Sequence, residues 1–278
     1  MAEVIERRRK QPRRAMYVLP SLFTAGNIAV GFYAILQSMQ AVTTGDHNYF
    51  DRAALAIAFA MPFDALDGRI ARMTNTASEF GKELDSLADV ITFGVAPAIL
   101  AYLWGFRMLP ELGNLVFRQK VMDLGMFICF LFLICGASRL ARFNITKDPQ
   151  PQNPGRPDRK YFVGMPIPAA AGVVVSVVHC FNGSPVDNIW VALLWLTFVS
   201  FVGFLMVSRW RFWSGKEINL SHGRPFRLLI LLTLAIVPIY LFHQYVLIAL
   251  GLGYTVYGLF SRVSYGWMRR RASHAASN

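Results

Sequence analysis

Eight apolar stretches, each about as long as a bilayer-spanning helix, constrain the fold of this chain more than any other feature. A transmembrane helix needs about 20 mostly apolar residues. Runs of that kind lie at 19–40, 53–73, 86–106, 121–141, 165–181, 188–208, 226–242 and 244–261. Only 16% of the residues are charged, against about 25% in a typical soluble domain. The sequence therefore predicts an all-α, polytopic membrane helix bundle with about eight transmembrane helices.

The distribution of Lys and Arg predicts the orientation of these helices. If the N-terminus lies in the cytoplasm, all but four of the 28 Lys and Arg residues fall in cytoplasmic segments. The four on the other side are Arg52, Arg107, Arg118 and Lys120. Such a bias is what the positive-inside rule describes, so we expect both termini to be cytoplasmic. The net charge of +12 is then explained by anionic lipid headgroups, and we expect no nucleic-acid partner.

Acidic residues are concentrated where a membrane protein can least accommodate them. Six of the 16 acids lie between residues 64 and 89: Asp64, Asp67, Glu79, Glu83, Asp85 and Asp89. A charged side chain at the bilayer centre costs about 2.5–3.5 kcal/mol on insertion scales. Acids retained at such a cost are candidates for a functional site.

Helical spacing predicts that four of these acids converge. Residues 64, 67, 68, 71 and 72 share one face of a helix, since they lie at i, i+3, i+4, i+7 and i+8. Residues 81, 85 and 89 stack in the same way on the next helix. The short polar segment 73–80 can turn between the two. We therefore expect Asp64, Asp67, Asp85 and Asp89 to meet across one helix–helix contact.

Four aspartates gathered in this way need cations, because ionised carboxylates repel one another. Hard oxygen ligands suit Mg²⁺ or Mn²⁺, and their number suits two ions bridged by shared carboxylates. The small residues Gly68, Ala71 and Gly81 leave room for a ligand. Arg72 adds a planar donor fork for phosphate oxygens. The pattern favours a diphosphate site, although a divalent-cation transporter and a non-catalytic membrane scaffold stay open.

At these residues the sequence resembles the CDP-alcohol phosphotransferase family. The signature D-x2-D-G-x2-A-R-x8-G-x3-D-x3-D is matched at every fixed position from Asp64 to Asp89. The resemblance implies that Asp64, Asp67 and Asp85 are metal ligands and that Asp89 is both a metal ligand and the general base. It also implies contacts with the CDP headgroup from Gly68, Arg72, Ser78 and Gly81.

The same resemblance implies a domain organisation. The family fold has six core transmembrane helices and commonly forms homodimers. We therefore expect a basic cytoplasmic segment at 1–18, a six-helix core at 19–208, and a final part at 209–278. That final part would contain a cytoplasmic loop, two additional helices and a basic tail. Thr24 and Asn27, one turn apart in the first helix, could contact CDP-diacylglycerol or could serve helix packing.

Four further stretches resemble the bacterial members of this family that use serine as the acceptor. They are 19–27, 84–97, 136–144 and 162–171. This likeness implies transfer of the phosphatidyl group from CDP-diacylglycerol to L-serine, with release of CMP. It also implies a multi-pass protein of the bacterial inner membrane whose active site faces the cytoplasm. Inositol phosphate, glycerol phosphate and choline remain alternative acceptors.

The cytoplasmic end of the fourth predicted helix carries the candidate acceptor-binding residues. Arg139 and Arg142, with Asn144 beside them, could bind the carboxylate of serine or a lipid phosphate. Each arginine could instead be an ordinary cytoplasmic anchor. His179 and His243 lie near predicted membrane ends with no metal-ligand spacing, so we expect them to be interfacial residues without a special role.

Overall fold

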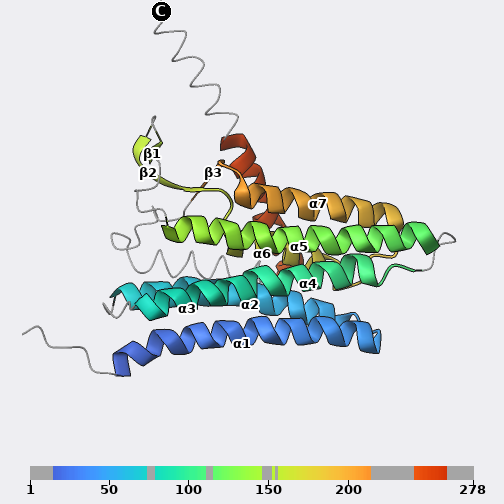
Figure 1. The fold of residues 1–278 in the computed structure, drawn as a ribbon, viewed down its shortest axis with the longest axis horizontal. Coiled ribbons are helices and arrows are strands. Elements are labelled where there is room, and N and C mark those ends of the chain that lie inside the picture. Colours follow the sequence, from blue (N-terminus) through green and yellow to red (C-terminus); the bar gives the residue numbers. More distant parts are fainter. Residues whose placement is uncertain are drawn as a thin grey trace, which may run out of the picture.

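A computed structural model describes residues 15–73, 79–110, 115–145, 152–153, 156–213 and 241–261. Within those ranges it describes the backbone but not the side chains of 15–21, 66–73, 79, 152–153 and 156–161. Long helices lying side by side make up most of this structure (Figure 1).

The first two helices form an antiparallel hairpin. Helix α1 spans Ala15–Thr44 and α2 spans Asn48–Met73. The turn between them contains Gly45, whose φ of 74° favours glycine. Asp46 Oδ1 then accepts a hydrogen bond of 3.0 Å from the backbone N–H of Asn48. That acidic side chain satisfies a free amide at the start of α2 and so favours a helix beginning there.

The third long helix is continuous but not uniformly α-helical. It consists of α3 (Glu79–Asp89), the π-helical segment η1 (Val90–Val95), α4 (Ala96–Tyr102) and the π-helical segment η2 (Leu103–Arg107). π-Helical turns are rare and occur often at functional sites. Here η1 begins directly after Asp89, and its central residues Thr92, Phe93 and Gly94 are buried.

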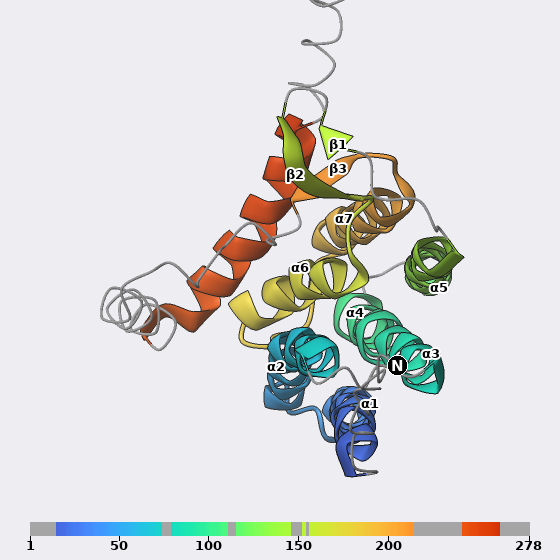
Figure 2. The ribbon, with the colours of Figure 1, turned by 90° about the vertical axis from the view of Figure 1, so that its left-hand side faces the viewer.

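The remaining helices complete the bundle. They are α5 (Leu115–Ile145), α6 (Ile167–Cys180), α7 (Ile189–Val207) and a C-terminal helix, Leu241–Ser261. Figure 2 shows α6 between α2, α4 and α7, and the C-terminal helix at the outside of the bundle. Helix α6 supplies many core side chains, among them Val173, Val174 and Val178. Seven of the eight apolar stretches are thus helical, and residues 226–240 of the other lie outside the described residues.

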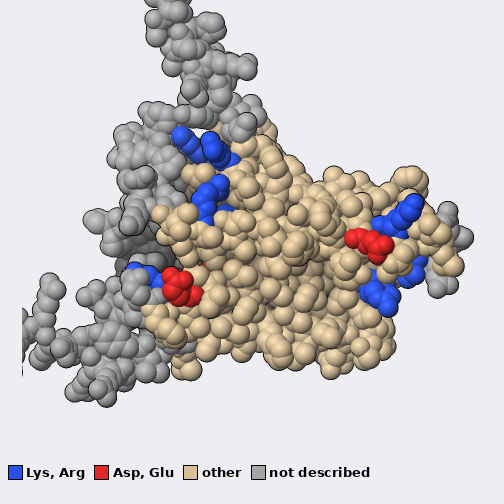
Figure 3. All heavy atoms as spheres, in the orientation of Figure 1, with Lys and Arg blue, Asp and Glu red and all other residues tan. Residues whose placement is uncertain are grey.

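The structure confirms an α-helical membrane bundle. Five of the described helices are long and apolar enough to cross a bilayer: α1, the Phe80–Arg107 helix, α5, α7 and the C-terminal helix. On the face drawn in Figure 3, Lys, Arg, Asp and Glu gather at the two ends of the molecule, and other residues fill the band between them. The count of eight helices and the side of the membrane on which the termini lie stay predictions.

A small antiparallel sheet, which the sequence did not lead us to expect, joins the end of α5 to the end of α7. Its strands are β1 (Gln152–Asn153), β2 (Arg156–Val163) and β3 (Arg211–Trp213), in the order β1-β2-β3. Phe162 pairs with Phe212 across β2 and β3. After β2, Gly164 has a φ of 77° and donates its N–H to Trp210 O at 2.8 Å.

Candidate active site

Acidic side chains from two helices meet at one end of the bundle. Asp64 belongs to α2, and Asp85 and Asp89 belong to α3. The carboxylates of Asp64 and Asp89 are in hydrogen-bonding contact. All three side chains are half-buried, and Oδ1 of Asp85 and Oδ1 of Asp89 are fully enclosed. The structure therefore brings Asp64 and Asp89 together, and Asp85 lies one turn before Asp89 on α3.

This donor set fits a divalent cation. Two carboxylates in contact repel each other unless a proton or a cation lies between them, and carboxylate oxygens are the ligands that Mg²⁺ and Mn²⁺ prefer. No group of three or more His, Cys, Asp or Glu side chains is close enough to hold a metal ion among the described residues. The fourth aspartate, Asp67, follows Asp64 on α2, but its side chain lies outside that description.

The expected CDP contacts fall largely where side chains are not described. Gly68 and Arg72 lie on the helical backbone of α2, at four and eight residues after Asp64. Ser78 lies outside the described residues. Gly81 is half-buried on α3, one turn before Asp85. The backbone of α2 thus keeps residues 64, 68 and 72 on one face, as their spacing predicts.

Arg139 of α5 is directed at the acidic site. Its side chain is only 7% exposed, and its guanidinium interacts electrostatically with Asp89. It also lies over two aromatic rings, 5.4 Å from the centroid of Phe143 and 5.8 Å from that of Phe162. A buried cation held between aromatic rings and an acid is well placed to bind an anionic group.

Arg142, one turn later, is engaged with the backbone instead. Its guanidinium donates to Val207 O at 3.3 Å and to Val163 O at 3.5 Å. The first carbonyl ends α7 and the second ends β2. These contacts tie α5 to both elements, so they favour a structural role for Arg142.

Asn144 also makes a contact between elements. Its Nδ2 donates to Ser86 Oγ at 2.9 Å, and Ser86 donates in turn to Lys82 O at 3.0 Å. Ser86 directly follows Asp85 on α3. Asn144 therefore links the end of α5 to the helix that carries two of the acids.

Thr24 and Asn27 lie one turn apart on α1, and Asn27 is next to η1. Both side chains are buried, at 4% and 3% exposure. Thr92 of η1 donates to Asn27 O at 2.9 Å. The side-chain amide of Asn27 has no hydrogen-bond partner at Oδ1 or Nδ2 in the part of the chain that the structure describes. A buried amide of this kind is a strong candidate for contact with a ligand, because leaving it unpaired is costly.

A cavity of about 270 Å³ opens beside Asn27. It lies between α1 and α2, with mostly apolar walls formed by Leu22, Phe23, Gly26, Asn27, Val30, Phe59, Ala60 and Phe63. Phe63 directly precedes Asp64. An apolar cavity with one polar amide, next to an acidic residue, suits a ligand that is partly lipid and partly polar.

The sequence interpretation missed a polar chain that involves His179. This residue lies in the last turn of α6 and is 1% exposed, and it has polar partners that its sequence context did not indicate. Its Nδ1 lies 2.6 Å from Asp51 Oδ1, and its Nε2 lies 2.6 Å from His243 Nδ1. Asp51 stands in the first turn of α2, about 20 Å along that helix from Asp64. The hydrogen-bonded residues Asp51, His179 and His243 connect α2, α6 and the C-terminal helix, away from the acidic site.

Comparison with known proteins identifies what the chain resembles. Residues 17–203 match the family model described as CDP-alcohol phosphatidyltransferase. The CDP-diacylglycerol–serine O-phosphatidyltransferase of Helicobacter pylori strain 26695 is 36% identical over 233 residues, which cover 81% of this chain and 84% of the relative. The Bacillus subtilis enzyme of that name is 33% identical over 75% of this chain and 99% of its own length. The Saccharomyces cerevisiae enzyme is 41% identical over 160 residues, which cover 57% of this chain and 53% of the yeast enzyme.

Proposed function

The chain belongs to the CDP-alcohol phosphatidyltransferase family, and on this basis we propose that it transfers the phosphatidyl group of CDP-diacylglycerol to L-serine. The products are phosphatidylserine and CMP. The observation that carries the proposal is the contact of Asp64 with Asp89 beside the buried guanidinium of Arg139. Relatives that are named for transfer to serine, and that match most of this chain, support serine as the acceptor.

Members of this family use divalent metal ions. We propose that Asp64, Asp67, Asp85 and Asp89 hold two ions here, either Mg²⁺ or Mn²⁺. When bound, such ions polarise phosphoryl oxygens and neutralise the negative charge that develops on departing CMP. The contact between the Asp64 and Asp89 carboxylates supports this assignment, since a shared cation removes their repulsion.

Asp89 is proposed as the general base of the transfer. Its carboxylate takes the proton from the serine hydroxyl as that oxygen attacks the phosphorus attached to diacylglycerol. A bond forms between serine oxygen and phosphorus, and the bond from phosphorus to the bridging oxygen breaks. The bridging oxygen leaves with CMP. The half-buried position of Asp89 next to Arg139 supports a site that binds an acceptor and excludes bulk water.

The remaining residues of the signature are assigned to CDP-diacylglycerol. We propose that Gly68, Arg72, Ser78 and Gly81 contact its CDP headgroup, and that Thr24 and Asn27 contact it from α1. The buried amide of Asn27 and the apolar cavity beside it support this assignment. A polar end held near the acids, with acyl chains along apolar walls and in the bilayer, matches the chemistry of a nucleotide-activated lipid.

Serine recognition is assigned to Arg139, whose guanidinium pairs with the serine carboxylate. Arg142 and Asn144 support it by joining α5 to β2, α7 and α3. Choline lacks a carboxylate, so a buried arginine here favours serine over choline.

We further propose a homodimer in the bacterial inner membrane, with the active site facing the cytoplasm. The bias of Lys and Arg toward one side supports the orientation. The mass of the purified protein–detergent complex tests the dimer, and a mass that fits one chain contradicts it.

One assay tests the proposed reaction. Purified protein in micelles with CDP-diacylglycerol is given L-serine, glycerol phosphate, inositol phosphate or choline, with Mg²⁺, with Mn²⁺ or with neither. We expect CMP release with serine and a divalent ion. CMP release only with another alcohol would overturn the acceptor. Metal flux in proteoliposomes without CMP release would indicate a cation transporter instead.

A further inference from the structure

The C-terminal helix, Leu241–Ser261, lies outside the region 17–203 that matches the family model, yet two of its glycines lie against the bundle. A methyl group added at Gly251 would lie 3.1 Å from Ser176 Oγ and 3.3 Å from Val173 Cα of α6. One added at Gly258 would overlap the ring of Phe212. Glycine at both positions therefore lets the helix approach α6 and β3.

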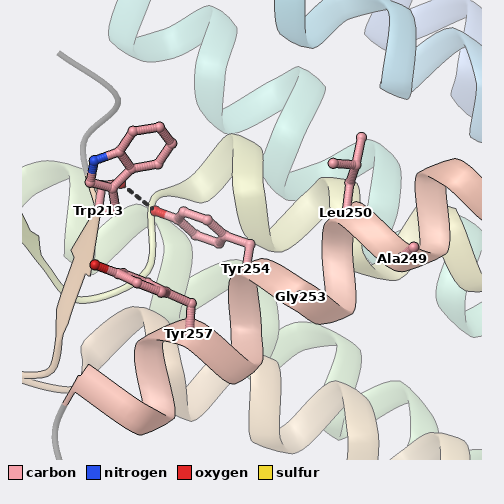
Figure 4. A pocket seen from close by; sticks show the side chains of 6 residues that line it. All are labelled: Trp213, Ala249, Leu250, Gly253, Tyr254 and Tyr257. Atoms are coloured by element: carbon pink, nitrogen blue, oxygen red, sulfur yellow. Dashed lines mark hydrogen bonds between the residues drawn. The ribbon is translucent and has the colours of Figure 1, made fainter. Parts of the chain in front are cut away.

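Tyr254 of this helix faces the small sheet. Its ring lies 5.6 Å from the ring of Phe212, centroid to centroid, and its hydroxyl donates to Trp213 O at 3.1 Å. Figure 4 shows the hydroxyl pointing at the Trp213 backbone, while Tyr257 extends from the next turn of the same helix. Both tyrosines line a cavity of about 410 Å³.

A continuous set of contacts leads from Tyr254 to the acidic site. Phe212 pairs with Phe162 across β3 and β2, and the Phe162 ring lies under the guanidinium of Arg139. The guanidinium of Arg139 in turn interacts electrostatically with Asp89. A path of aromatic residues thus leads from Tyr254 through Phe212 and Phe162 to the buried guanidinium of Arg139.

The far end of the C-terminal helix is anchored independently. His243 Nδ1 lies 2.6 Å from His179 Nε2, and the side chain of Gln244 donates to Asn182. Eleven residues separate His243 from Tyr254, which is about 16 Å along a helix. The helix is therefore held at one end by polar contacts and at the other by aromatic contacts near Arg139.

We infer that Tyr254 is a positioning residue for Arg139, and that the C-terminal helix completes the acceptor side of the active site. The inference rests on the proposed function, in which Arg139 binds the serine carboxylate. Tyr254 acts through Arg139 and the sheet, and it is not assigned a contact with the substrate.

Kinetics with the full-length protein in micelles test this role. For Tyr254→Leu, which removes the ring and the hydroxyl, we expect the KM for serine to rise about tenfold. The KM for CDP-diacylglycerol should stay within about twofold of the wild-type value, since the contacts proposed for its headgroup come from residues 24–81. Tyr254→Phe keeps the ring, so we expect it to restore most of the affinity for serine, with a residual rise of about threefold.

Tyr257→Leu is the matched control, because it truncates a tyrosine of the same helix and cavity. It should leave both KM values unchanged. Equal changes in the two KM values, or equal effects of the Tyr254 and Tyr257 variants, would overturn the inference.

Failure of the proposed function would look different. If the wild-type protein releases no CMP with serine, the acceptor is wrong, and the positioning role is then measured by thermal unfolding. Arg139→Ala, Tyr254→Leu and the double variant form a cycle in which we expect the shifts in melting temperature to be non-additive. Additive shifts would overturn the role of Tyr254 whatever the acceptor is.

Discussion

A methyl group added at Gly31 should impair catalysis although Gly31 is not assigned a contact with the substrate. Gly31 is buried where α1 crosses η1. A Cβ atom there would lie 2.6 Å from Thr92 Oγ1 and 2.9 Å from Thr92 Cα, whereas an ordinary contact begins at 3.4 Å. Rotation of the Thr92 side chain can relieve the first contact. The second involves the backbone, so α1 and η1 must separate by about 0.5 Å.

The separation acts on the general base, because Thr92 follows Asp89 by three residues on the same continuous helix. Misplacement of a catalytic group by about 1 Å can cost roughly a hundredfold in rate, so half that shift should cost about tenfold. We therefore expect Gly31→Ala to lower kcat about tenfold. The methyl group costs about 1–3 kcal/mol through overpacking, and about 1 kcal/mol is regained from the better helix propensity of alanine.

The assay is CMP release at saturating substrates, together with thermal unfolding in detergent. Gly26→Ala makes the same change on the same helix, where an added Cβ meets nothing within 4 Å, so it is the control for stability. It should unfold at the wild-type temperature or above. A folded Gly31→Ala protein whose kcat stays within about twofold of wild type would refute the argument.

Three further predictions concern the acids and the polar chain at the other end of the bundle. Asp89→Asn should lower turnover at least about a hundredfold while membrane insertion stays intact; turnover retained with serine would contradict the base assignment. Chelation by EDTA should stop CMP release, and excess Mg²⁺ or Mn²⁺ should restore it, whereas activity that resists the chelator would exclude the metal assignment. His243→Ala should destabilise the protein by about 1–3 kcal/mol, because it removes a hydrogen-bonding partner of the buried His179. The exposed His47 is its control, and equal melting temperatures for His243→Ala and His47→Ala would contradict the role.

The helices and the meeting of the aspartates could be predicted because both depend on local periodicity. A 3.6-residue repeat fixes which side chains share a face, so Asp85 and Asp89 were expected to stack on one helix facing Asp64. The π-helical segment η1 was not predicted, since it adds a residue to one turn without a change in hydropathy. The sheet was not predicted either, because β2 pairs with β3 about 50 residues later in the chain.

Local periodicity also could not show that Arg139 and Arg142 have different roles. Three residues separate them on α5, so both lie near the same face and at similar depth. What distinguishes them is tertiary: Gly164 lets the chain turn beside α7, and the carbonyls of Val163 and Val207 then engage Arg142. No spacing rule contains that information, because the carbonyl acceptors belong to other segments that end beside Arg142 only in the folded protein.

The polar partners of His179 could not be predicted, because they are distant from it in the sequence. Asp51 is 128 residues away in the chain and His243 is 64 residues away. A single histidine in an apolar helix is costly unless its ring nitrogens are paired. That cost is a usable signal: it predicts that some distant polar side chain must reach His179. Since one of the two partners belongs to the C-terminal helix, the burial of His179 in the core requires that helix to pack against the bundle. The helix then also brings Tyr254 to the sheet beside Arg139, so a polar contact far from the acids helps to shape the acceptor side of the site.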